Sequence, residues 1–112
     1  MNPTGSLLRV QQFKLNQKRQ TVRELETTIE DFLHTVGDLD LQIEAEEANS
    51  GISDKDHISY SPFARATSVR RNNLLLSIKQ LEVKLTEIEN ELDYTVIEFH
   101  KALADLGIDG EG

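Results

Sequence analysis

The side chains most suited to metal or acid–base chemistry are three histidines and a large number of carboxylates. His34, His57 and His100 do not share the H-x-x-x-H or H-E-x-x-H spacing of a zinc site. Glu30 and His34 fall on one face of a predicted helix, but two groups on an exposed helix face are normally solvated. The histidines therefore predict no metal site.

A second candidate is the acidic segment that begins at Asp54, which resembles the start of a calcium-binding loop. Such a loop requires glycine at its sixth position and glutamate at its twelfth. Ser59 and Arg65 occupy those positions, so the pattern excludes an EF-hand. The chain also lacks glycine-rich phosphate-binding motifs, and its carboxylates fall on water-facing helix positions without a pocket to tune them. We therefore predict no catalytic, cofactor-binding or metal-ligating residue, no cofactor and no enzyme activity.

Composition narrows the classes of protein to which this chain could belong. The 112 residues suffice for one domain, and the absence of cysteine excludes disulfides and thiolate metal sites. The formal net charge of −8 argues against nucleic-acid binding, because that binding depends mainly on neutralising phosphates. No apolar run approaches the length of a membrane span, and the N-terminal MNPTGSLLRV has no signal-peptide pattern. We therefore expect no direct insertion into a membrane.

The stretch from about residue 62 to residue 106 is predicted to be one long helix. Ser61 and Pro62 form a typical helix start, a capping hydroxyl followed by a ring with helical φ, and Gly107 is a typical stop. Apolar residues recur within it in steps of four and three, which is the seam of a coiled coil. The seam residues are Leu74, Ile78, Leu81, Leu85, Ile88 and Leu92.

A second long helix is predicted from about residue 6 to residue 48, with Ser6 as its N-cap. Gly37 interrupts it beside the seam, either as a tolerated weak point or as a bend or a place where a partner approaches closely. Its apolar seam consists of Leu8, Leu15, Val22, Leu25, Ile29, Phe32, Val36, Leu39 and Ile43, with Gln11, Lys18 and Glu46 as polar exceptions.

A loop over about residues 49–61 joins the two helices, because Asn49-Ser50-Gly51 is a helix stop and the following residues break the period. Residues 1–5 are predicted to be a short leader, and residues 107–112 a polar tail. The predicted fold is therefore all-α: one domain, 1–112, in which two long helices form an antiparallel coiled-coil hairpin.

Charge supports this pairing of the two helices. Residues 1–23 hold five basic and no acidic residues, and residues 85–112 hold eight acidic residues and one basic residue. Residues 24–56 are strongly acidic, and residues 57–84 are mainly basic. Folding the chain back at the loop sets basic blocks against acidic ones, with facing residues whose numbers sum to about 110–117. The polar seam positions then cluster at the open end, which should fray more easily.

Three surfaces are candidates for binding a partner. The first is an outer stripe on the second helix at the heptad position that should face water. The second helix is unusually apolar at this heptad position, and the first helix carries Phe13 and Leu41 at the equivalent heptad position. The alternative is that these are scattered surface residues, which need no explanation. The stripe consists of Val69, Leu76, Val83 and Ile97.

The other two surfaces lie at opposite ends of the predicted hairpin. The surface at the loop is either a recognition tip or a small cap over the end of the seam. It consists of Ile52, Tyr60 and Phe63, together with Ile58. The basic block at the open end either binds a partner or pairs with the acidic helix opposite. It contains Arg9, Lys14, Arg19 and Arg23.

The residues around the loop resemble a known family. The segment EEANSGISDKDHISYSPFARATSVRRNNLL is similar to the central region of alphaproteobacterial FliJ-type flagellar export proteins, and SLLRVQQFKLNQKRQTVRELE resembles their N-terminal region. The resemblance covers roughly residues 6–106. Its more specific features are Gly51-Ile52-Ser53-Asp54, Arg70-Arg71-Asn72 and Leu74-Leu75, since seam residues are shared by many long helices.

This resemblance implies an antiparallel two-helix coiled coil in the flagellar type III protein export apparatus, and hence a role in flagellum biogenesis and motility. Family members look like the central stalk of rotary ATPases. Their helix ends engage the export ATPase hexamer and promote its assembly and activity, and the rest of the rod contacts the cytoplasmic domain of the export gate. Some also escort export chaperones.

Carried onto this chain, the resemblance makes Leu8–Arg23 with Phe99–Leu106 the part that faces the ATPase. The half nearer the loop would face the gate. The expected location is the cytoplasm, peripherally associated with the inner membrane through the apparatus. Two other classes fit the same pattern: a structural coiled coil that self-associates into a helical bundle, and a chaperone that holds an amphipathic helix along the outer stripe.

Overall fold

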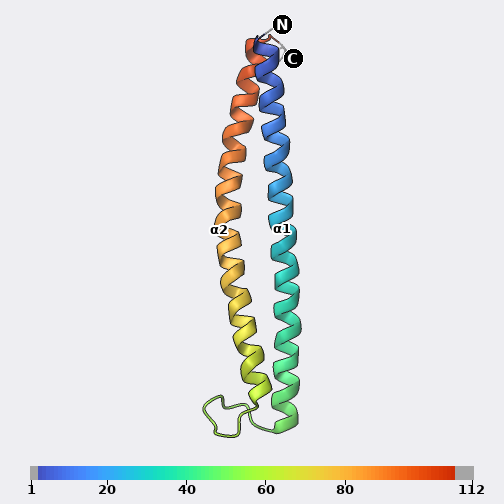
Figure 1. The fold of residues 1–112 in the computed structure, drawn as a ribbon, viewed down its shortest axis with the longest axis vertical. Helices are drawn as coiled ribbons and strands as arrows, with labels where there is room; N and C mark the ends of the chain where they lie inside the picture. The colour runs from blue at the N-terminus through green and yellow to red at the C-terminus, as the bar shows by residue number, and fades with distance from the viewer. Residues whose placement is uncertain (1–2, 108–112) are drawn as a thin grey trace. The chain divides into compact units, whose positions relative to one another are not determined.

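The structure, a computed structural model, describes residues 3–107 and contains two helices in that range (Figure 1). Helix α1 spans Pro3–Ser50 and helix α2 spans Pro62–Asp105. Residues 51–61 connect the end of α1 to the start of α2. The predicted all-α helical hairpin is therefore confirmed.

The helix ends follow the predicted signals at three of four places. Gly51 has φ of 75° and its N–H donates to the Glu47 carbonyl at 2.9 Å, which closes α1. The Ser61 hydroxyl accepts the N–H of Ala64 at 3.1 Å and caps α2. Gly107 has φ of 73° and follows the last turn of α2.

The predicted start of α1 is wrong. The helix begins at Pro3, so Ser6 lies inside it and does not cap it. Residues 3–5 of the predicted leader are likewise helical, because a helix accepts proline at its first position. Residues 1 and 2 of that leader and residues 108–112 of the predicted tail lie outside the described part of the chain.

The chain divides into two compact units. The loop unit comprises residues 27–82, and within it α1 and α2 run antiparallel on either side of the loop. The terminal unit comprises residues up to 26 and from 83 onwards, where the first part of α1 lies beside the last part of α2.

Within each unit the predicted heptad phase is confirmed by burial. Every predicted seam residue of both helices is buried or half-buried, and every predicted outer position is exposed. The polar exceptions Gln11, Lys18 and Glu46 are half-buried, as seam positions should be. Apolar burial along this seam is the main source of packing energy, at about 25 cal/mol for each Å² removed from water.

The loop closes its own unit with a small core of Ile43, Tyr60 and Ala64, against which Ile52 packs. Ser61 donates to the Glu46 carboxylate at 2.8 Å, and Arg71 donates to Asp40 at 3.1 Å. The numbers of these bonded residues sum to 107 and 111, so the second pair falls within the predicted range of about 110–117 and the first falls slightly below it.

Candidate interaction surfaces

The outer positions of α2 carry large apolar side chains that contact water in both units. Val69 and Leu76 in the loop unit are 55% and 60% exposed. Val83 and Ile97 in the terminal unit are 61% and 53% exposed. Their exposure agrees with the predicted outer stripe, and their role in binding a partner stays a prediction.

Two of the three residues of the predicted recognition tip are not exposed. Tyr60 is only 4% exposed, and Ile52 packs against the small core that Tyr60 belongs to. These two side chains therefore form the cap over the end of the seam, which was the alternative interpretation. Phe63 remains 53% exposed, and its neighbour in the loop, Ile58, is almost fully exposed.

Polar contacts fix Tyr60 within this cap. Its phenol donates to the Glu47 carboxylate at 2.6 Å, and the guanidinium of Arg65 lies over its ring, 5.3 Å from the centroid. The hydrogen bond to Glu47 raises the pKa of the Tyr60 phenol above its ordinary value of 10.0, and burial and the negative charge of Glu47 add to this effect. The Arg65 charge opposes it. Tyr60 thus serves as a structural anchor.

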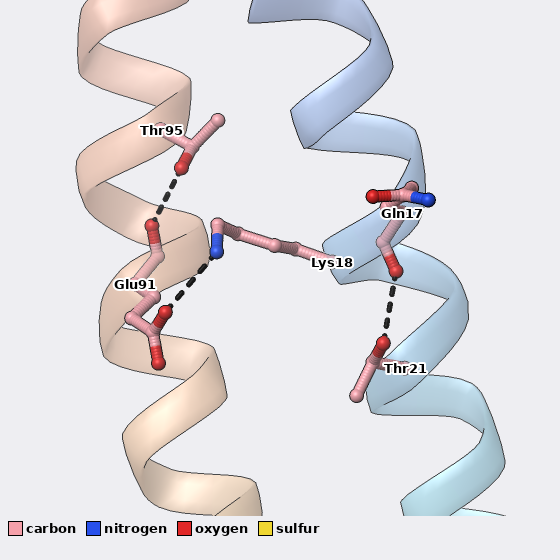
Figure 2. A network of polar contacts seen from close by, with 5 residues as sticks. All are labelled: Gln17, Lys18, Thr21, Glu91 and Thr95. Atoms are coloured by element: carbon pink, nitrogen blue, oxygen red, sulfur yellow. Dashed lines mark hydrogen bonds and ion pairs between the residues drawn. The ribbon is translucent and has the colours of Figure 1, made fainter.

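The basic segment at the start of α1 is only partly neutralised by the facing helix. Lys18, at a seam position, donates to the Glu91 carboxylate at 3.1 Å (Figure 2). The four predicted site residues are all exposed, and within residues 3–107 none of them forms an ion pair. They are Arg9, Lys14, Arg19 and Arg23. Their positive charges are therefore available to a partner.

A shallow groove in the terminal unit runs beside the Lys18–Glu91 ion pair. The residues that line it include Gln11, Lys14, Lys18, Tyr94 and Glu98. The seam residue Thr95 is buried, and its hydroxyl donates to the backbone carbonyl of Glu91 at 2.9 Å (Figure 2). Figure 2 shows the same arrangement in α1, where Thr21 donates to Gln17 at 3.1 Å. Each threonine is satisfied by its own helix, so the polar seam needs no external ligand.

The loop unit contains an apolar groove that sequence reasoning missed. Leu33 from α1 and Leu75 and Leu76 from α2 line it, with Lys79 and Glu82 at its edge. Leu33 and Leu75 are half-exposed although they lie next to the seam. A signal for it was present, because both residues occupy the same heptad position, and in an antiparallel pair these positions face each other.

Among residues 3–107, no three carboxylate or imidazole side chains lie close enough together to hold a metal ion. His34 lies 3.8 Å from Asp38, one turn along the same helix, and both are exposed. Neither helix, within that range, has a stretch long and apolar enough to span a membrane.

No protein-family model, curated protein or solved structure matches the chain. Membership of the FliJ-type family therefore stays a prediction from the residue pattern. The more specific part of that pattern consists of Gly51–Asp54, Arg70–Asn72 and Leu74–Leu75. In the structure these residues all belong to the loop unit, where Ile52 packs into the cap and Arg71 pairs with Asp40.

Proposed function

We propose that the chain is a non-enzymatic coupling protein of flagellar type III export. In this role it connects the export ATPase ring to the cytoplasmic domain of the export gate, and also escorts export chaperones. It would act in the cytoplasm, held at the inner membrane by those partners. The observation that supports this most is the basic segment in the first part of α1, where four exposed cations have no ion-pair partner within residues 3–107: Arg9, Lys14, Arg19 and Arg23.

The physical basis is electrostatic and mechanical. Four exposed cations spread over about four turns of α1 would attract an acidic ring surface and speed encounter with it. Continuous helices of 48 and 44 residues transmit a displacement along their axes better than loops would. The exposed apolar residue Leu76 of the loop unit offers a separate surface for a second partner, and Val83 is an exposed apolar residue of the terminal unit.

The first test is stimulation of the cognate export ATPase. Adding the wild-type protein to the purified hexamer should raise hydrolysis, and the double variant Arg19→Glu, Arg23→Glu should lose most of the effect. The matched control is Arg70→Glu, Lys84→Glu, which makes the same charge change at exposed positions of α2. An unchanged hydrolysis rate with a correctly folded wild-type protein would refute the proposal.

The second test concerns the outer stripe. Leu76→Ser with Val83→Ser should leave helicity intact, because both side chains are about three-fifths exposed. The variant should bind the gate domain more weakly in a pull-down with purified components. Loss of circular-dichroism signal would instead assign these leucine and valine side chains to the core.

A further inference from the structure

One face of α1 in the loop unit combines an unexplained glycine with unpaired charge. Gly37 is exposed, has no left-handed φ, and a Cβ added to it would meet nothing within 4 Å. Neither backbone conformation nor internal packing therefore requires glycine, although it costs about 1 kcal/mol relative to alanine. The open space lies on the outside of the helix.

The residues around Gly37 describe what could fill that space. Leu33 and Leu41, four residues to either side, are 50% and 63% exposed. Glu30 and Glu44, seven residues to either side, are exposed and form no ion pair with the described residues. On an α-helix, the two leucines point about 40° away from the direction of Gly37, and the two glutamates point about 20° away from it. The face is thus a notch between two leucines, with one carboxylate beyond each end.

The complementary pattern is present in the terminal unit of the same chain. Arg9 and Arg23 are exposed, unpaired within residues 3–107, and fourteen residues apart, as Glu30 and Glu44 are. At 1.5 Å per residue both pairs span about 21 Å. Phe13 lies between the two arginines and is 62% exposed. Cation spacing and carboxylate spacing therefore match, and an exposed apolar side chain lies between the cations as the two leucines lie between the carboxylates.

We propose that the acidic face centred on Gly37 binds the basic segment Arg9–Arg23 of a second copy of this chain. Laid antiparallel, Arg9 meets Glu44 and Arg23 meets Glu30. In this register Asn16 faces Gly37, and Phe13 lies beside Leu41. Opposed helix dipoles favour this direction over the parallel one. Every copy carries both segments, so no other protein is required. Because Gly37 lacks a side chain, the helix of the second copy can approach the backbone closely at this point.

This inference is independent of the proposed function, and it has a consequence for it. The segment that would bind the ATPase would be covered in the self-associated protein, so the two interactions would compete. The net charge of −8 opposes association at long range, whereas the facing blocks attract at short range. Added salt should therefore dissociate the complex, because the contacts are exposed ion pairs around one aromatic side chain.

The test is analytical ultracentrifugation of the full chain at low ionic strength. The wild-type protein should show a mass that rises above the monomer value with concentration. Phe13→Ser and Gly37→Gln should each lower the association constant by at least about tenfold, since the first removes the aromatic side chain that packs beside Leu41 and the second blocks the close approach of the helices at Gly37. Ile97→Ser and Ala66→Gln are matched controls at other exposed positions and should leave it unchanged.

Charge reversal makes the test specific. Glu30→Arg with Glu44→Arg should be monomeric alone, and so should Arg9→Glu with Arg23→Glu. A mixture of these two variants should associate again, because each supplies the charge that the other lacks. A wild-type protein that stays monomeric at all soluble concentrations would overturn the proposal. Association that survives Phe13→Ser and Gly37→Gln, or is lost only in Ile97→Ser, would overturn it as well.

Discussion

Replacing Gly37 by alanine should stabilise the protein, although most substitutions in a folded chain destabilise it. The position lies well inside α1, between Pro3 and Ser50, and has ordinary helical φ. The added Cβ would meet no atom within 4 Å, so neither a clash nor new burial contributes. What remains is the difference in helix propensity, about 1 kcal/mol in favour of alanine.

Urea denaturation followed by circular dichroism measures this difference directly. Low-micromolar protein and high salt keep the chain monomeric, so that self-association does not affect the midpoint. The free energy of unfolding should rise by about 1 kcal/mol, which corresponds to roughly 4–6 °C in the melting temperature. The reverse substitution Ala45→Gly, at an exposed position of the same helix, should lower stability by a similar amount.

A loss of stability in Gly37→Ala would refute this reasoning. It would mean that the helix bends at Gly37 or that a neighbouring side chain fills the space outside it. A gain of stability accompanied by weaker self-association would separate the two roles of the residue. Glycine would then be unfavourable for the isolated helix and favourable for docking.

Three further substitutions test the loop and the polar seam. Ser61→Ala should cost about 1 kcal/mol in urea unfolding, because it removes the N-cap of α2. Wild-type stability should fall as pH rises above about 10, since the unfolded chain releases the phenol proton of Tyr60 before the folded state does. Tyr60→Phe should remove that part of the pH dependence, while Tyr94→Phe, at an exposed position, should retain it. Lys18→Leu should raise the free energy of unfolding by about 1 kcal/mol. An apolar seam residue would then replace an exposed ion pair, which contributes only tenths of a kcal/mol.

The heptad phase of both helices could be predicted from sequence because burial in a hairpin is a local, periodic property. A residue such as Ile78 or Leu39 is inward-facing whatever the rest of the chain does, once its helix has a partner. Helix ends at Gly51 and Gly107 were equally predictable, since a left-handed residue after a helix favours glycine. The start of α1 was predicted wrongly because Ser6 and Pro3 are competing signals for a helix start, and the helix begins at Pro3.

The parts that sequence could not supply depend on the path of irregular backbone. Tyr60 and Phe63 are both aromatic, three residues apart and next to the same loop, yet one is buried and the other half-exposed. Their difference follows from how the loop turns back so that the Tyr60 hydroxyl reaches Glu47, which no periodicity encodes. The groove at Leu33 and Leu75 was missed for another reason, because its signal, the heptad position that the two leucines share, is visible only when both helices are compared.

Charge segregation along α1 supports two kinds of pairing that use different rows of the same helix. The inner pairs are Lys18 with Glu91 and Asp40 with Arg71, each next to the seam and within one unit. The outer charges, typified by Arg23, lie on the opposite side and meet no charge in residues 3–107. Inner pairs are partly exposed and contribute little, so the apolar seam carries stability. Substitution of the outer row can therefore change what the protein binds without changing how it folds.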